Sequence, residues 1–498
     1  MPVTEGGDQY SVWVGLIYIF NLIVGTGALT IPAAFARAGW GLSTISLVFL
    51  AFMSFMNATY VIETMACANA VFKWKRLQFL KRHSIQDNEK SEQTTSNPPA
   101  YADLEDPVVC GDSVPSCYYS LDKRMELGEM ADLFLSKIAR KMFYCTLCVY
   151  LYGDLSIYSA AVSKSLTDVV CSKVPSMTNI TDWDNIPCFH ASEGAFTRID
   201  CYRMALLTFF AAMGPFVFFN VQKTKYLQLF TSGMRWLAFV IMMSMAIHLL
   251  IKHGPQGRPP AFDFTGMPTL FAACAYSFMC HHSLPGLISP IRGKSHLGLH
   301  LSLDYMLISI FYLLLAFTGA FAFANLNDLY TLNFVPTDNE NIFLEIVEYF
   351  LALFPVFTLS TSFPIIAITL RNNLQSLFLD TSRLESYNFA LRKLIFPIVA
   401  VVPPLLLTYF LEDISFLIEF TGFYAGAWVQ YLIPTFLVVS ARRHCANLLG
   451  LGVVNKYKSP FSNVSWAVFV LLWFFICIIL VALNTIQKPS DRKIPYLP

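Results

Sequence analysis

The sequence has little charge for its length. Asp, Glu, Lys and Arg make up 13% of its 498 residues, whereas about a quarter of the residues in soluble domains are charged. This leaves too little charged surface to wrap soluble domains, which excludes an ordinary cytosolic enzyme and a disordered scaffold. The net charge of +1 gives no basic surplus, so nucleic acid is not expected as a partner. A nucleophile elbow, a metal triad and a phosphate-binding loop are also missing, so no enzymatic activity is predicted.

Long apolar stretches are abundant instead. Apolar residues make up 55% of the chain, and eleven stretches are long enough to cross a bilayer as helices. The stretches are continuous rather than alternating, which argues against a strand barrel. We therefore expect an all-α polytopic membrane protein, with spans near residues 11–36, 42–70, 140–165, 201–221, 229–251, 267–290, 301–324, 343–370, 391–410, 414–440 and 464–486.

Lysine and arginine in the loops predict the orientation. They are concentrated in loop 71–141 and in the other loops on the same side, which should therefore be cytosolic. This places the N-terminal tail, residues 1–10, in the cytosol and the C-terminal tail, residues 487–498, in a lumen or outside the cell. The outer loop 166–200 carries a glycosylation sequon at Asn179, and Cys171 with Cys188 as a candidate disulfide, for which Cys201 is a rival partner. Either the plasma membrane or an endolysosomal membrane fits this topology.

The long cytosolic loop, residues 71–138, has a different composition. Residues 83–118 are polar and predict disorder, while residues 121–138 predict an amphipathic helix against the membrane or the bundle. Two short motifs overlap at Tyr101. Pro98 and Pro99 with Tyr101 form a sequence of the kind that WW domains bind, and residues 101–104 match a tyrosine-based sorting signal. A WW-domain protein or a clathrin adaptor is therefore a candidate partner at residues 98–104.

Two of the expected spans contain helix breakers near their middle. The first has Gly25 and Gly27, and the sixth has a polar stretch that ends at Pro285 and Gly286. Unwound backbone inside a membrane can hold a carboxylate on free N–H groups and a cation on free carbonyls. Glycine for close helix packing is the alternative for the first span. Because the breaks lie five spans apart, they indicate an inverted-repeat transporter with repeats at 11–252 and 266–441, and an added span at 464–486.

The residues 21–29, Asn-Leu-Ile-Val-Gly-Thr-Gly-Ala-Leu, resemble the first-helix signature of the amino acid/auxin permease family. More closely, the chain resembles the transmembrane protein 104 group of that superfamily, in the segments 150–155 (Tyr-Leu-Tyr-Gly-Asp-Leu), 221–228 (Val-Gln-Lys-Thr-Lys-Tyr-Leu-Gln), 276–280 (Tyr-Ser-Phe-Met-Cys), 363–373 and 421–426. The resemblance implies eleven helices in a LeuT-like, five-plus-five inverted repeat, and amino acid transport.

Candidate site residues follow from the breaks and from the resemblance. The expected substrate-binding residues are Val24, Gly25, Thr26, Gly27, Ala28, Tyr152, Tyr276, Ser277 and Met279. The resemblance places Asn21 beside a coupling ion, with hydroxyls of the eighth span completing the site, for which the candidates are Thr358, Thr361 and Ser362; these hydroxyls can instead bond their own helix. Asp154, an acid within the third span, suits proton carriage or is a satisfied buried acid.

The favoured function is a secondary active transporter of amino acids or similar small zwitterionic solutes. It would work by alternating access, with sodium or protons as the coupling ion and without any other cofactor. The alternative is a sensor or scaffold that keeps the fold and signals through its cytosolic loop.

Overall fold

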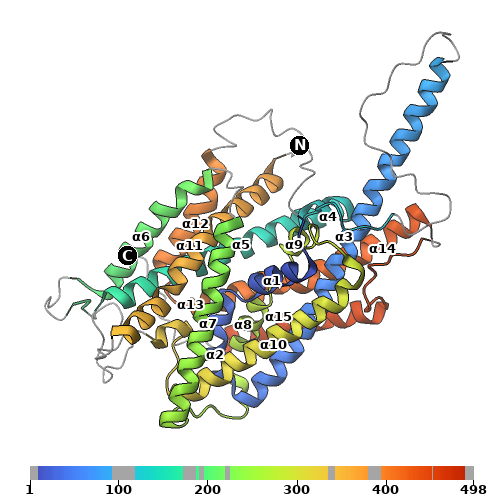
Figure 1. The fold of residues 1–498 in the computed structure, drawn as a ribbon. Helices are drawn as coiled ribbons and strands as arrows, with labels where there is room; N and C mark the ends of the chain where they lie inside the picture. Colours follow the sequence, from blue (N-terminus) through green and yellow to red (C-terminus); the bar gives the residue numbers. More distant parts are fainter. Residues whose placement is uncertain are drawn as a thin grey trace.

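The computed structural model shows an all-helical molecule whose long helices pack side by side (Figure 1). It describes residues 9–91, 118–171, 187–189, 196–218, 225–334, 342–379, 394–450 and 453–487. The helices are α1 (Val12–Ile23), α2 (Thr26–Ala38), α3 (Trp40–Ser91), α4 (Leu127–Phe134), α5 (Lys137–Val170), α6 (Arg198–Met213), α7 (Lys225–His253), α8 (Met267–Ser277), α9 (Leu284–Ile288), α10 (Leu297–Ala322), α11 (Ile342–Phe378), α12 (Phe396–Phe410), α13 (Ile414–Phe420), α14 (Ile433–Leu449) and α15 (Val464–Gln487). Two π-helical segments, η9 (Thr421–Gly426) and η10 (Trp428–Leu432), join α13 to α14.

Local sequence signals explain where several helices begin and end. The Ser11 hydroxyl accepts a hydrogen bond from the Val14 N–H at the start of α1, and Asp413 caps α13 in the same way. Gly39 follows α2 with a φ of 87°, a conformation that glycine adopts without strain. The chain therefore turns at Gly39 and re-enters the bundle as α3.

Seven described helices are long and apolar enough to cross a membrane, and the bent pair α1–α2 brings the number to eight. Among the other expected spans, α12 and α15 are shorter apolar helices, and the sixth is divided between α8 and α9. Large apolar side chains point outwards from these helices, for example Leu303, Leu307, Ile310 and Leu314 along α10. Such an apolar exterior suits a lipid environment.

Helix α5 is central to the packing. It lies along α11 and also contacts α6, α12 and η9, while α2 packs against both α8 and α10. The first broken region, α1–α2, therefore lies between α10 and α8, while η9 packs on α8 and α5 reaches α8 through the Tyr276–Asp154 hydrogen bond. This arrangement positions the candidate site inside the bundle.

The structure corrects two expectations about the cytosolic loop. Helix α3 continues to Ser91, where disorder was expected from residue 83, and its end projects from the bundle in Figure 1. The amphipathic helix expected at 121–138 is shorter, because α4 ends at Phe134 and the Ser136 side chain caps the start of α5. α4 packs on α3, α5 and α14, so it lies against the bundle. The motif residues Pro98, Pro99 and Tyr101, the sequon at Asn179 and the tail 488–498 lie outside the described residues.

Candidate functional site

The first span is broken within two residues. Helix α1 ends at Ile23 and α2 begins at Thr26, with a bend of 54° between them. Gly25 precedes α2, and no side chain caps that helix. The first N–H groups of α2 are therefore left for another acceptor, and they lie at the positive end of the helix dipole.

The sixth span is interrupted over a longer stretch. α8 ends at Ser277, and α9 begins at Leu284 after six residues without regular helix. Pro285 lies in the first turn of α9, a position in which proline favours a helix start. The interruption therefore follows from local sequence, as in the first span.

The two breaks face each other. A Cβ atom placed on Gly27 would lie 2.6 Å from the Ser277 Cα, so only glycine permits this approach. The Tyr312 hydroxyl, from α10, donates to the carbonyls of Ile23 at 2.9 Å and Ser277 at 3.1 Å. A single side chain thus bridges the last residues of α1 and α8.

Asp154 brings an acidic group to the same region. It is buried on α5, and its Oδ1 accepts a hydrogen bond from the Tyr276 hydroxyl at 2.6 Å. The neighbouring Gly153 makes room for Thr421, because a Cβ there would lie 2.1 Å from the Thr421 Oγ1. α5, α8 and η9 therefore meet beside the break in α8.

Unpaired buried polar atoms mark the break in the first span. Both side-chain polar atoms of Asn21 are buried without a hydrogen-bond partner, and the Thr421 hydroxyl, which lies against Gly153 of α5, also has none. Buried polar groups normally have partners. Their lack of partners fits a place that receives a polar ligand.

A cation also lies at this break. Arg235 of α7 donates from Nη1 to the Asn21 carbonyl, and to the Val24 carbonyl at 3.0 Å. Asn21 lies in the last turn of α1, and Val24 is the residue directly after its end.

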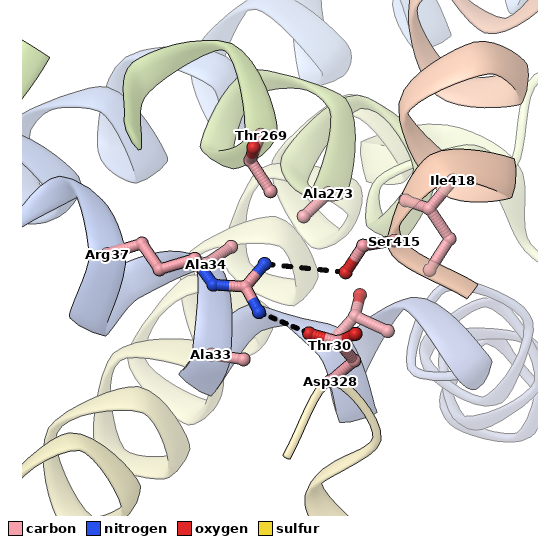
Figure 2. Close-up of a pocket in the computed structure, with 9 residues that line it drawn as sticks. All are labelled: Thr30, Ala33, Ala34, Arg37, Thr269, Ala273, Asp328, Ser415 and Ile418. Carbon is pink, nitrogen blue, oxygen red and sulfur yellow. Dashed lines mark hydrogen bonds and ion pairs between the residues drawn. The ribbon is translucent and has the colours of Figure 1, made fainter. Parts of the chain in front are cut away.

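One end of the site is closed by an ion pair. The Arg37 guanidinium, at the end of α2, contacts the Asp328 carboxylate and donates to the Ser415 hydroxyl at 3.4 Å (Figure 2). Both contacts close over a small pocket whose walls include Thr30, Thr269 and Ile418. The pair is partly exposed, so it contributes at most about 1 kcal/mol to stability and can be broken at low cost.

The opposite end carries the lysine- and arginine-rich loops, and we call it the basic face. The Tyr10 hydroxyl donates to the Leu287 carbonyl of α9 at 2.5 Å, and the Arg292 N–H donates to the Tyr10 carbonyl at 2.9 Å. The Lys294 ammonium donates to the carbonyls of Leu121 and Ser289. These hydrogen bonds join the segment before α1, the segment before α4 and the loop after α9. We call this joined layer, which includes Tyr10, Leu121, Arg292 and Lys294, the cover on the basic face.

Comparison with known proteins gives the family. The chain is 51% identical to "Transmembrane protein 104 homolog" of Drosophila melanogaster, over 96% of this chain and 98% of the relative. It is 46% identical to "Transmembrane protein 104" of Homo sapiens, over 98% of this chain and 99% of the relative. The chain belongs to the transmembrane protein 104 family. In addition, residues 8–75, which include the first break, match the model of the family "Transmembrane amino acid transporter protein".

A solved structure supports the fold of this family member. "Crystal structure of MhsT in complex with L-phenylalanine" aligns with a TM-score of 0.53, over 97% of this chain and all of that chain, at 12% identity. At that identity the likeness concerns the fold alone. Together with the membrane-length apolar helices, it makes the chain a multi-pass, all-helical membrane protein that shares the fold of that structure.

The structure brings most of the predicted substrate residues together. Those from Val24 to Ala28 lie at the first break, and those from Tyr276 to Met279 at the second. Tyr152 is the exception, because its hydroxyl donates to the Val399 carbonyl of α12 at 2.6 Å. The reason is helix geometry: residues four apart share a face, as Tyr150, Asp154 and Tyr158 do, whereas a residue two positions away points elsewhere.

The predicted ion-binding hydroxyls of α11 bond their own helix. Thr358 donates to the Phe354 carbonyl at 3.0 Å, while Thr361 and Ser362 both donate to the Thr358 carbonyl. This is the usual behaviour of Ser and Thr within a helix. Among the described contacts, none joins these hydroxyls to Asn21.

The predicted disulfide and one buried ion pair lie away from the breaks. Cys171 and Cys188 form a disulfide, and the Cys201 sulfur lies within 4.8 Å of both. Glu63 of α3 is paired with Arg442 of α14 through two hydrogen bonds of 2.8 and 2.6 Å.

Sequence reasoning did not single out four residues to which the structure draws attention: Tyr312, Arg37, Asp328 and the buried Asp304. Tyr312 is one tyrosine in an apolar run, and Arg37 and Asp328 are ordinary residues at span ends. Asp304 was detectable as a carboxylate inside an expected span. Arg235 was expected from the sequence as one of the few charges within a span, but its contact with α1 was not.

Proposed function

We propose that this chain is a secondary active transporter that moves amino acids or similar small zwitterionic solutes by alternating access. The observation that carries the proposal is the pair of broken helices whose ends are bridged by Tyr312. Broken helices at the centre of a bundle are typical of substrate and ion sites in secondary transporters. The match of residues 8–75 to an amino acid transporter family supports the same function.

The chemistry of the breaks suits a zwitterion. The uncapped start of α2 at Thr26 and Gly27 offers N–H groups to a carboxylate. The carbonyls at the end of α8 and the Asp154 carboxylate offer acceptors to an ammonium group. The flexible side chain of Met279 lies beside Gly426 of η9 and would have to shift to admit the substrate side chain. The LeuT-like neighbour was solved in complex with L-phenylalanine, which supports this substrate class.

The proposed topology has eleven spans in two inverted repeats. α1–α2, α3, α5, α6 and α7 would form the first repeat, and α8–α9, α10, α11, α12 and α13–α14 the second, with α15 added. In alternating access, the Arg37–Asp328 pair and the cover on the basic face would open in turn. The N-terminus would be cytosolic, in the plasma membrane or an endolysosomal membrane.

Uptake of labelled amino acids into proteoliposomes tests the proposal. The full-length protein would be reconstituted, and a panel of amino acids offered with and without imposed ion gradients. We expect gradient-dependent uptake of at least one of them, above that of protein-free liposomes. Flat uptake across the whole panel in every gradient would contradict transport of this substrate class.

A sensor is the second candidate, because the segment that follows residues 92–117 is bonded to the basic face through Lys294 and Leu121. That contact could pass a change in the broken helices to the cytosolic loop, where a WW-domain protein or a clathrin adaptor would bind at residues 98–104. Deletion of residues 92–117 separates the two functions. A transporter should keep its flux after the deletion. A sensor should show no flux even as the intact protein, and should lose ligand-dependent binding of its partner when the loop is deleted.

A further inference from the structure

The guanidinium of Arg235 has unusual partners for a charged group inside a helical bundle. It is half-buried in α7, and its Nη1 donates to two backbone carbonyls, those of Asn21 and Val24. No ion pair within the described part of the chain includes Arg235. The side chains of Tyr158 and Tyr312 lie near it, and a tyrosine hydroxyl carries no charge at neutral pH. Its countercharge is therefore the end of α1.

That end of α1 is a cation site by its own chemistry. The last carbonyls of a helix lack N–H partners and carry the negative end of the helix dipole. In broken membrane helices, such carbonyls are the groups that coordinate a coupling cation. Here the two carbonyls at Asn21 and Val24, three residues apart on one face, already accept the guanidinium.

A sodium ion does not fit beside Arg235. Sodium bound to the carbonyls of Asn21 and Val24 would lie next to a positive guanidinium, and no carboxylate is in place among the described residues to offset the repulsion. The α11 hydroxyls at Thr361 and Ser362 donate to their own helix and are not drawn towards α1. The Arg235 side chain, from α7, supplies the positive charge that a coupling metal ion would otherwise bring.

We propose that Arg235 is a resident cation of the first break and takes the place of a coupling sodium ion. The residue makes the protein independent of sodium and holds α1 to α7 through the Asn21 and Val24 carbonyls. The replacement of a coupling ion rests on the proposed transport function. The contact between Arg235 and the two carbonyls, and its effect on sodium binding, can be tested without measuring transport.

Thermal unfolding of the full-length protein in detergent is the first test, with sodium chloride compared with choline chloride at equal concentration. We expect the same unfolding midpoint in both salts for the wild type and for Arg235→Lys, which keeps a fixed cation. Arg235→Met should unfold several degrees lower in choline, and sodium should restore part of the loss because the carbonyls become free to bind it.

Arg371→Met is the matched control. Arg371 also donates to a backbone carbonyl, that of Val217 at 2.8 Å, but far from the break. Its loss should lower the midpoint equally in both salts. A sodium-specific rise in the wild-type midpoint would overturn the proposal, and so would an Arg235→Met variant that is as stable and as sodium-insensitive as the wild type. If Arg235→Met does not fold, the wild type and Arg235→Lys still decide the question.

Uptake of amino acids into proteoliposomes in sodium and in choline separates the proposed role of Arg235 from the proposed transport function. Uptake that is equal in sodium and choline supports the resident cation, whereas a roughly tenfold loss in choline overturns it while transport stands. Absence of uptake in both salts counts against transport, and the unfolding measurements then judge the role of Arg235 alone.

Discussion

At the scale of single residues, three side chains define the chemistry of the breaks. Tyr312 donates to the ends of α1 and α8, Arg235 donates to the end of α1, and Asp154 accepts from Tyr276. All three come from neighbouring helices. The broken backbone is therefore stabilised by side chains that lie outside it, since freed carbonyls inside a bundle need donors.

Removal of the Tyr312 hydroxyl should uncouple the two breaks. Tyr312→Phe leaves the carbonyls of Ile23 and Ser277 without that donor, which should cost about 1–3 kcal/mol of stability and reduce uptake several-fold. Tyr202→Phe is the control, because the Tyr202 hydroxyl donates to the Thr408 carbonyl at 3.1 Å, away from the breaks. It should lose similar stability but keep uptake. Equal uptake by both variants would show that Tyr312 has only a structural role.

Asp154 should carry the proton if protons drive transport. Asp154→Asn keeps an acceptor for the Tyr276 hydroxyl but cannot bind and release a proton. We expect uptake that no longer responds to an imposed proton gradient, with little change in the unfolding midpoint. Glu419→Gln is the control, because Glu419 pairs with Thr269 near the closed end of the site; it should keep the response. An unchanged proton response in Asp154→Asn would assign coupling to another group.

At the scale of helices, small residues let the broken elements approach. Gly27 lies against Ser277, Gly153 lies against Thr421, and Gly422 lies against the backbone of Ala272. Three contacts between α2, α5, α8 and η9 thus depend on the absence of a Cβ atom. The two interpretations of the first-span glycines, unwinding and close packing, are both correct here: Gly25 lies in the break and Gly27 in a tight contact.

A methyl group at Gly27 should separate α2 from α8. Gly27→Ala places a Cβ 2.6 Å from the Ser277 Cα, and such overpacking costs about 1–3 kcal/mol. Gly298→Ala is the control, since no atom lies within 4 Å of the added Cβ in α10, and it should stabilise by about 0.5–1 kcal/mol. Chemical unfolding measures both, and a Gly27→Ala variant as stable as the control would contradict the close packing of the breaks.

At the scale of the whole molecule, the membrane explains the distribution of charge. The ion pairs Arg37–Asp328 and Arg124–Glu126 are at least partly exposed and lie near helix ends, whereas Glu63 pairs with Arg442 in the interior between α3 and α14. Apolar side chains cover the outside. Charge in the interior is restricted to a few groups, among them Asp154, Arg235 and Asp304. Each of these is costly in a bilayer, so a role in function is the favoured explanation.

The proposed orientation can be tested at Asn179. If the loop that contains it faces a lumen or the cell exterior, the protein expressed in eukaryotic cells should carry a glycan there. Treatment with a glycosidase should increase its mobility on a gel, and Asn179→Gln should abolish the shift. Asn463→Gln serves as the control, because its sequon should face the cytosol and remain unmodified. A glycan at Asn463 would reverse the proposed topology.

Much of the architecture could be predicted from the sequence because its signals are local. Apolar length predicted membrane helices, and glycine and proline marked both breaks near Gly25 and Pro285. The ends of α3 and α4 were predicted poorly, since polar composition alone does not separate an exposed helix from a loop. Tyr152 was assigned to the wrong face of α5, because the rotation of that helix depends on its packing and not on its own sequence.

The sequence alone determined that this chain lives in lipid, that its helices break at two corresponding places, and that it resembles the transmembrane protein 104 family. Those conclusions depend on composition and on neighbouring residues. The tertiary structure decided that Tyr312 joins the breaks and that Arg235, rather than the hydroxyls of α11, reaches the end of α1. Such contacts connect residues about 35 to 290 positions apart, and only the packing of the helices brings them together.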